Sequence, residues 1–116
     1  MITVWVLEKA SKEITGTGYE PDIWGVLRAL EKDGRVPSAW FHRETDDFDA
    51  LGPPRTTVRI YYAKHAGQII VLHAASGKHG KGKLPANTKR TVEQRLQAWK
   101  SSYPKGRADP AGEEKK

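Results

Sequence analysis

The sequence predicts a small α+β domain in which helices pack against a mostly antiparallel, twisted sheet of about four strands. The chain has 116 residues, which suffices for one domain and not for two. Strand-like and helix-like segments follow one another in the order β-α-β-β-β-α. The strands predicted at 56–63 and 68–75 are joined by only four residues, "KHAG", and this short connection favours an antiparallel hairpin at the centre of the sheet.

The first half of the chain contributes two strands and one helix. "ITVWVL" at 2–7 alternates and is rich in residues that favour strands. "SKEITGTG" at 11–18 is predicted to be a loop or the end of a turn. A helix is predicted at 20–34, because proline suits its start, apolar residues recur at helical spacing, and Gly34 suits the position after the last turn. "SAWFHRE" at 38–44 favours a strand.

The second half supplies the central hairpin and the last helix. "TDDFDALGPP" at 45–54 is predicted to be a loop, since its two prolines cannot lie inside a sheet. A helix is predicted at 85–103, with an apolar stripe made by Val92, Leu96, Trp99 and Tyr103. Residues 104–116 have no apolar periodicity, which predicts a disordered tail after a domain that spans 1–103. The tryptophans are predicted to lie in the core: Trp5, Trp24, Trp40 and Trp99.

Charge is distributed unevenly along the chain. The formal net charge is +6. Residues 1–50 carry six Lys or Arg and ten Asp or Glu, a balance of −4, whereas 77–107 carry nine cations and one acid, a balance of +8. Clustered cations are typical of a protein that binds a phosphate-rich partner. The alternative is a solvated basic surface that has no partner.

The absence of certain residues and segments excludes several classes of protein. The chain has no cysteine, so it has neither a disulfide framework nor a thiolate metal site. Its start, "MITVWVLEKA", lacks the basic region of a signal peptide, and its apolar run is too short to cross a membrane. We therefore expect a cytoplasmic protein without membrane contact.

The densest run of cations and glycines is "SGKHGKGK" at 76–83, directly after the strand at 68–75. Residues 77–83 match the first seven positions of the phosphate-binding G-x-x-x-x-G-K-[ST] motif, but Leu84 stands where a magnesium-binding hydroxyl is needed. Too little chain follows for the remaining strands of a nucleotide-hydrolysing fold. Glycine amides and lysines nevertheless suit phosphate oxygens, so a phosphate-binding role remains.

The segment "VRIYYAKHAGQIIVLHAASGKHGKGKLP", followed by a basic helix, resembles the RelE/HigB superfamily of bacterial toxins, and within it the phage-derived Gp49-like branch. The shared pattern is a "yRilY" strand, a short hairpin, an apolar strand, a Lys-rich turn and a helix. The resemblance covers residues 55–100, whereas 1–35 fit only in the order of elements. In two departures, Ala75 replaces an aromatic residue and the turn is longer and richer in glycine.

The resemblance implies a RelE-like toxin of a type II toxin–antitoxin system. Such a toxin is an mRNA interferase that cleaves mRNA, usually on the ribosome, and a partner antitoxin, here expected to be of the helix-turn-helix type, neutralises it. The enzymes use no metal or other cofactor: the 2′-hydroxyl attacks the adjacent phosphate while basic residues stabilise the charge and a side chain moves protons.

The strand predicted at 56–63 has two unlike faces because its side chains alternate. One face is apolar and is expected to pack on the helix at 20–34; it consists of Val58, Ile60 and Tyr62. The other is polar and consists of Thr57, Arg59 and Tyr61. Arg59 also matches the arginine of the family's strand pattern, and a guanidinium suits a transition-state phosphate. The alternative for Arg59 is a salt-bridging sheet arginine.

Three residues are predicted to be catalytic: Arg59, His79 and Lys78. An imidazole can protonate a leaving 5′-oxygen near neutral pH, although His79 is equally well explained as a solvated loop histidine. His73 lies on a strand, where a structural role is favoured. Five further residues are predicted to bind RNA, namely Lys81, Lys83, Tyr61, Arg90 and Arg95. Tyr61 is predicted either to stack on a base or to pack in the core. The two arginines are predicted either to follow the RNA or only to keep the polar face of the last helix in contact with water.

Other functions remain open at this stage. "HRETDDFD" at 42–49 contains His42, Asp46, Asp47 and Asp49, but their spacing fits no standard pattern of metal ligands, so no metal site is predicted. One alternative is a ParE-type toxin of the same fold that binds DNA gyrase. Another is a nucleic-acid-binding phage protein without activity.

Overall fold

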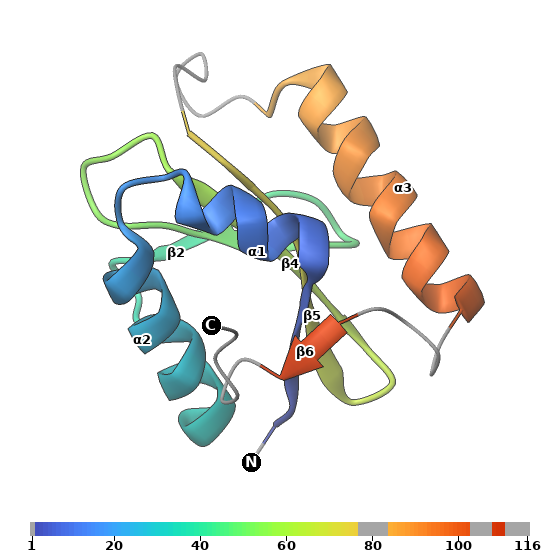
Figure 1. Ribbon diagram of the computed structural model, residues 1–116, viewed down its shortest axis with the longest axis horizontal. Coiled ribbons are helices and arrows are strands. Elements are labelled where there is room, and N and C mark those ends of the chain that lie inside the picture. Colours follow the sequence, from blue (N-terminus) through green and yellow to red (C-terminus); the bar gives the residue numbers. More distant parts are fainter. Residues whose placement is uncertain (1, 77–83, 103–107, 111–116) are drawn as a thin grey trace.

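The computed structural model describes residues 2–76, 84–102 and 108–110, which form a six-stranded mixed sheet and three helices (Figure 1). The strands lie in the order β2-β3-β4-β5-β1-β6. They span Val4–Leu7 (β1), Phe41–Arg43 (β2), Asp49–Leu51 (β3), Arg59–His65 (β4), Gln68–Ala75 (β5) and Ala108–Pro110 (β6). The helices span Glu8–Thr15 (α1), Glu20–Asp33 (α2) and Ala86–Ser102 (α3). The α+β class predicted from the sequence is confirmed.

The β4–β5 hairpin lies at the centre of the sheet, as predicted. Its connection is shorter than the four-residue "KHAG", because β4 continues to His65 and pairs there with Gln68. Ala66 and Gly67 form the turn, with φ angles of 55° and 75°. Two successive positive φ values match the twist of a two-residue hairpin, and glycine accepts this conformation without steric cost.

The sheet is mostly antiparallel, and β1 is the exception. It lies parallel to β5, with Val4 opposite Ile69 and Val6 opposite Val71. On its other side β1 pairs with β6, antiparallel, through Val6 and Asp109. The segment 104–116 was predicted to be a disordered tail; the part of it that the structure describes, β6, satisfies the backbone groups of β1 that would otherwise form a sheet edge.

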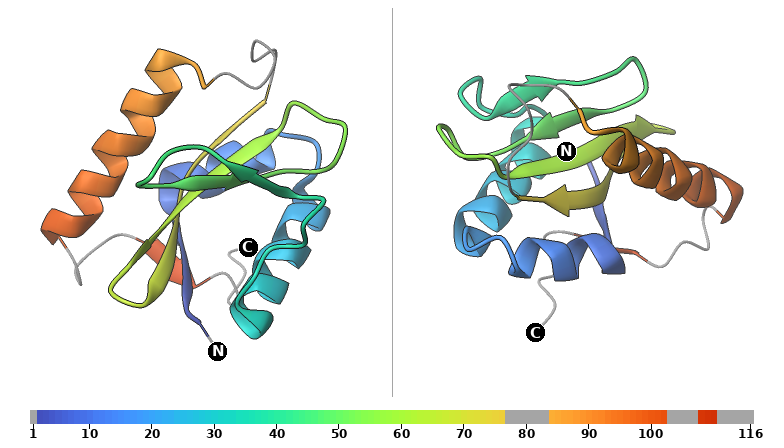
Figure 2. Two further views of the ribbon diagram at one scale, coloured as in Figure 1. Left: turned by 180° about the vertical axis from the view of Figure 1, so that it is seen from behind. Right: turned by 90° about the horizontal axis from the view of Figure 1, so that it is seen from above.

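Helices cover both faces of the sheet (Figure 2). On one face α1 and α2 pack against β4 and β5, and the predicted contact of the 20–34 helix with Val58, Ile60 and Tyr62 is confirmed. The helix contributes Ile23, Trp24, Leu27 and Leu30 to that cluster. It ends as predicted at Gly34, where φ is 78° and the amide donates to the Leu30 carbonyl at 2.8 Å.

On the opposite face α3 packs through the predicted apolar stripe. Val92, Leu96 and Trp99 are buried there, while Tyr103 lies outside the described residues. Trp24 is likewise buried, and Trp5 and Trp40 are partly buried against the two clusters. None of the three helices in the described ranges has the length and apolar character that crossing a membrane would require.

Two segments predicted to be loops are regular elements instead. The segment 11–18 was predicted to be a loop or the end of a turn, but its first five residues belong to α1, Glu8–Thr15, because Ala10 and Ile14, four positions apart, are both fully buried against the sheet. So short a helix depends on tertiary packing rather than on its own propensity. Within 45–54, Asp49–Leu51 forms β3 because Ala50 and Leu51 are buried between two partner strands. The prolines follow this strand and lie outside it.

Gly52 ends β3 at a point where two backbones approach closely. Its amide donates to the Trp40 carbonyl at 2.9 Å. A Cβ atom at position 52 would overlap the carbonyl oxygen of Val58 and would lie 3.3 Å from Nη1 of Arg59. Because the obstacle includes backbone, only glycine fits without a shift of the chain.

We therefore expect Gly52→Ala to lower the free energy of unfolding by ~1–3 kcal/mol, the usual range for overpacking. Gly25, inside α2, has open space where a Cβ would stand, so Gly25→Ala should raise it by ~0.5–1 kcal/mol. Urea unfolding of both variants measures the contrast. Equal effects of the two substitutions would contradict the close approach at Gly52.

Candidate functional site

A row of side chains crosses four strands on the face that α3 partly covers. The pairs that define it are His42 with Ala50, Ala50 with Tyr61, and Tyr61 with His73. The rings of Tyr61 and His73 are stacked, with centroids 5.9 Å apart and an interplanar angle of 17°. The row brings two histidines from separate parts of the chain to one side of the sheet.

An irregularity in the central hairpin places His73 on this face. Tyr61 pairs with His73 but Tyr62 pairs with Val71, so Leu72 is an extra residue in β5. Before it, Ile69 and Val71 belong to the α1/α2 cluster; after it, Ala74 does. Side chains of a regular strand alternate, so without the bulge His73 would share the face of Val71.

Arg59 stands next to this row. It pairs with Ala75 and, two residues from Tyr61, points to the same face. Its side chain is half-buried, and Nη1 donates to the carbonyls of Thr56 at 2.9 Å and Val58 at 2.8 Å. These two bonds orient the guanidinium without using its other nitrogens.

The charge of Arg59 affects the pKa of two neighbouring side chains, His42 on β2 and Glu44 just after it. Burial raises the pKa of Glu44, and the carboxylate of Asp49 adds to this, while the charge of Arg59 opposes it. Burial also lowers the pKa of His42, and Arg59 lowers it further. The Nε2 atom of His42 is buried and has no hydrogen-bond partner among the described residues. A carboxyl and an imidazole whose pKa values are shifted beside one arginine are typical of a site for proton transfer.

Tyr61 is not available to RNA in this conformation. Its side chain is 1% exposed, one face stacks on His73, and the Phe48 ring meets it edge-on at 6.0 Å. Burial, followed by the charge of Glu44, raises its pKa to about 12, so the hydroxyl stays protonated. The predicted stacking on a base is therefore corrected: the packing of the sheet, the other role considered, is what the structure has.

A second polar cluster closes the end of β5. The last pair between β5 and β1 is Val71 with Val6, and beyond it the β1 side of β5 has no strand partner among the described residues. Side chains satisfy that edge: the Ala74 amide donates to Oε1 of Glu13 at 3.1 Å, and Nη1 of Arg95 donates to the Leu72 carbonyl at 2.9 Å.

Glu13, His73 and Arg95 also bind one another. The guanidinium donates to both carboxylate oxygens of Glu13, at 2.8 and 3.0 Å. Nδ1 of His73 lies 2.9 Å from Oε1 of Glu13, so it carries the proton and donates to the carboxylate. Burial alone would raise the pKa of Glu13, but the hydrogen bonds from His73, Arg95 and the Ala74 amide outweigh it and lower the pKa to about 2.

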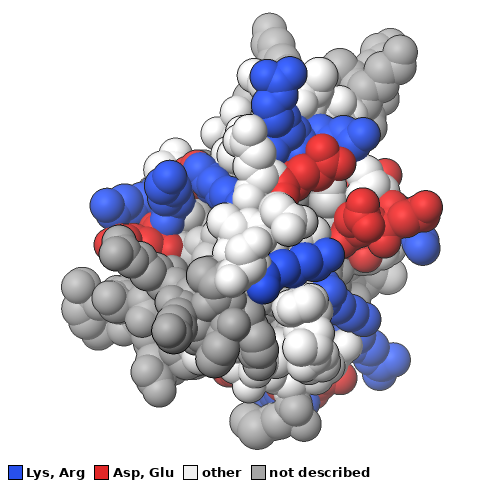
Figure 3. All heavy atoms as spheres, turned by 90° about the vertical axis from the view of Figure 1, so that its right-hand side faces the viewer, with Lys and Arg blue, Asp and Glu red and all other residues white. Residues whose placement is uncertain are grey.

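The other predicted site residues fall into two groups. Lys78, His79, Lys81 and Lys83 lie outside the described residues. Arg90 is exposed on α3, where RNA could reach it, whereas Arg95 is engaged by Glu13 and is 19% exposed. On the side of the molecule that carries α3, blue and red side chains are interspersed among the residues described (Figure 3). The described part of α3 is therefore no continuous cationic surface.

Sequence reasoning missed Glu13 and Glu44. Glu44 stands two residues after His42, so the alternation of β2 was a usable signal for a shared face. Glu13 could not be found, because it lies 60 residues from His73 and on a segment predicted to be a loop. Among the residues that the structure describes, no group of three His, Asp or Glu side chains could hold a metal ion.

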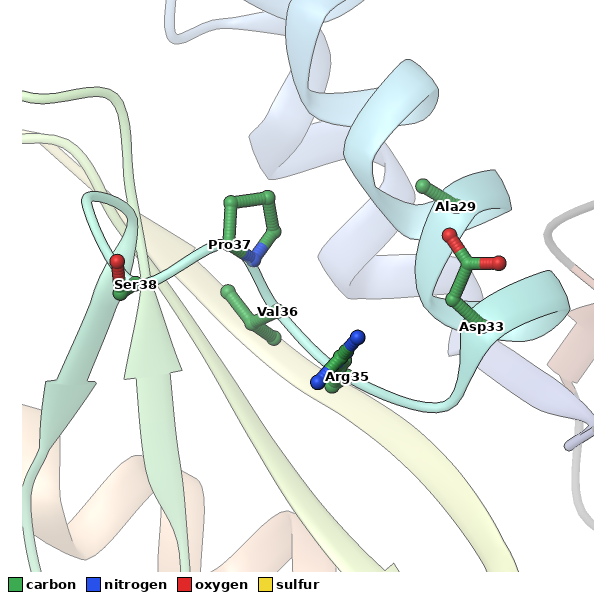
Figure 4. A pocket seen from close by; sticks show the side chains of 6 residues that line it. All are labelled: Ala29, Asp33, Arg35, Val36, Pro37 and Ser38. Atoms are coloured by element: carbon green, nitrogen blue, oxygen red, sulfur yellow. The ribbon is translucent and has the colours of Figure 1, made fainter.

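One hollow in the described surface lies elsewhere. It has a volume of about 360 Å³ and lies between the end of α2 and the segment that leads to β2 (Figure 4). Its lining consists of Ala29, Asp33, Arg35, Val36, Pro37 and Ser38. Only one acid and one base line it, and both are exposed to solvent. The sheet face around Arg59 is therefore the better candidate.

The fold and the site define the chain as a small α+β domain with a mixed sheet and a half-buried arginine among acid–base groups. Comparison with protein-family models found no match. A search of curated proteins likewise found no match.

The lowered pKa of Glu13 predicts a pH-dependent stability. Because the folded-state pKa lies below the ordinary value of 4.5, the ionised carboxylate stabilises the fold above about pH 4.5, and this contribution is lost as the pH falls toward about 2. The difference in unfolding free energy between the wild type and Glu13→Gln should shrink over that window. Urea unfolding between pH 7 and pH 2.5 measures it, with Glu8→Gln, an exposed acid of the same helix, as the control. A constant difference would contradict the assignment.

Proposed function

We propose that the protein is the toxin of a type II toxin–antitoxin system, a metal-independent endoribonuclease that cleaves ribosome-bound mRNA. One observation carries the proposal: Arg59 lies on the central strand opposite Ala75, the residue immediately before the Lys-rich segment "SGKHGKGK". Its partners would be mRNA on the ribosome and an antitoxin of the helix-turn-helix type. The resemblance of residues 55–100 to RelE/HigB toxins supports the same conclusion.

In this proposal Arg59 stabilises the phosphate. Cleavage by the 2′-hydroxyl passes through a transition state with additional negative charge on the phosphate oxygens, and a guanidinium can donate two hydrogen bonds to such a group. The bonds from Nη1 to two backbone carbonyls hold Arg59 in place before RNA binds. Little ordering is then required when RNA arrives, which is the condition for effective electrostatic stabilisation.

Glu44 is the proposed general base. Its pKa is raised by burial and by Asp49, which makes the carboxylate a stronger proton acceptor than an exposed glutamate. The step transfers the 2′-hydroxyl proton to Glu44 while the 2′-oxygen forms a bond to phosphorus. His42, with a lowered pKa, is neutral near pH 7 and leaves the neighbouring positive charge to Arg59.

The two alternatives considered from the sequence differ from this proposal in one measurable property. Neither a ParE-type toxin that binds DNA gyrase nor a nucleic-acid-binding phage protein without activity cuts mRNA. Cell-free translation with mapping of the 5′ ends of cut mRNA separates them from a nuclease. A 2′-deoxy substitution at the mapped cut should abolish cleavage, because the attacking hydroxyl is then missing.

Arg59→Ala is expected to lower the cleavage rate by ~10²-fold or more, the scale of one lost transition-state donor. Arg28→Ala, which removes an exposed arginine on α2 behind the opposite face, is the matched control and should keep the wild-type rate. Thermal unfolding of both variants separates a loss of activity from a loss of fold. A folded Arg59→Ala variant with full activity would overturn the proposed site.

Glu44→Gln should also slow cleavage and should change its pH dependence. A base acts only when ionised, so the wild-type rate should fall as the pH drops through the raised pKa of Glu44. The variant lacks this group and should lose that acidic limb. Asp46→Asn, at an exposed acid two residues away, should retain it. An unchanged pH–rate profile in Glu44→Gln would assign the base to another residue.

A further inference from the structure

The polar cluster at the end of β5 contains one more hydrogen bond than its structural task requires. Glu13 and Arg95 already satisfy the unpaired Ala74 amide and Leu72 carbonyl, and they neutralise each other through two bonds. His73 adds a third donor to Oε1 of Glu13. Removing the imidazole would leave both edge groups and both charges paired, so the edge does not explain the histidine.

Two contacts set the tautomer and the orientation of the His73 ring: Nδ1 donates to the Glu13 carboxylate, which can only accept, and the face of the ring lies on Tyr61. Nη1 of Arg95 lies 3.2 Å from Nδ1, but its two hydrogens are directed to Glu13 and to the Leu72 carbonyl. Nε2 takes part in none of these contacts, and the side chain remains 15% exposed. An imidazole held at one nitrogen by a carboxylate presents the other nitrogen in a set direction.

The position of His73 relative to Arg59 suits a second proton-transfer group. Arg59 pairs with Ala75, and His73 precedes Ala75 by two residues on the same face. Diagonal neighbours of this kind have Cα atoms about 7–8 Å apart, within the span of one nucleotide linkage for long side chains. Glu44, which follows β2, interacts electrostatically with Arg59, and β2 and β5 lie on opposite sides of β4 in the sheet.

We propose that His73 is the general acid of the cleavage reaction, and that Glu13 and Arg95 are positioning residues that hold its ring. The inference rests on the proposed function. In the acid form the imidazole is an imidazolium, with protons on both Nδ1 and Nε2. As the 2′-oxygen bonds to phosphorus, the bond from phosphorus to the 5′-oxygen breaks, and the proton on Nε2 passes to that oxygen while the proton on Nδ1 stays on the bond to Glu13. The products are a 2′,3′-cyclic phosphate and a free 5′-hydroxyl. His73 is left neutral and regains a proton from water.

The decisive experiment compares two mRNA linkages at the mapped cleavage site. One is ordinary, and in the other sulfur replaces the bridging 5′-oxygen, so that the leaving thiolate needs no proton. His73→Gln should cleave the ordinary linkage ~10²-fold more slowly, the usual scale of a general acid. The sulfur linkage should restore most of that loss. Glu13→Gln should show the same pattern with a smaller loss.

Controls separate this inference from the fold and from the proposed function. Arg59→Ala, which removes charge stabilisation, should be slow on both linkages, and Arg28→Ala, at an exposed position of α2 away from the site, should be unaffected on either. Should Glu13→Gln fail to fold, His73→Gln leaves the Glu13–Arg95 pair intact and carries the test. Equal losses on the two linkages, or no loss, would overturn the role of His73 while the nuclease function stands. A wild type that cuts neither linkage overturns both.

A measurement without activity tests the positioning alone. Nitrogen NMR of the histidine side chains distinguishes the two tautomers of a neutral imidazole. His73 should carry its proton on Nδ1 in the wild type and lose this preference in Glu13→Gln, whereas Glu8→Gln should leave it unchanged. A wild-type His73 with its proton on Nε2 would overturn the proposed orientation.

Discussion

The ion pair between Glu13 and Arg95 joins α1, α3 and the end of β5, and the rest of the structure depends on this junction. The two residues are 82 positions apart, and they meet at the end of central strand β5, where its β1 side has no strand partner among the described residues. A buried amide or carbonyl without a partner is costly, so the edge must be closed by side chains once β1 has turned into α1. Closing it with a bidentate pair fixes α1 and α3 against the same strand.

This arrangement follows from the single parallel pair of the sheet. β1 runs beside β5 for three residues and then continues directly into α1 without a loop. The helix therefore starts at the level where β1 ends, and its first two turns lie along the remaining length of β5. Ala10 and Ile14 bury its apolar side, while Glu13, between them in sequence, reaches the strand edge. The short helix α1, which has few apolar residues, is thus stabilised by its contacts with β5.

The candidate site combines rigid placement with mixed charge. Arg59 is on a central strand and is held by backbone carbonyls, and the titratable groups around it come from β2 and β5. Tyr61, buried between the two sides, keeps them apart. Acid–base groups on neighbouring strands keep their relative distances better than groups on loops, which suits a reaction that requires a donor, an acceptor and a positive charge at fixed separation.

The sequence by itself determined the α+β class, the central hairpin, the 20–34 helix with its end at Gly34, and the face of β4 that carries Arg59. These features depend on local periodicity, on glycine conformation and on short connections. Only the tertiary structure decided that residues 8–15 are helical, that Asp49–Leu51 is a strand, and that Glu13 and Arg95 meet at β5. It also decided the face of His73, since simple alternation would have placed that side chain with Val71, and the bulge at Leu72 reverses the order. Burial against distant segments and a one-residue shift in register leave no periodic signal in the chain, because both arise only when the strands pair.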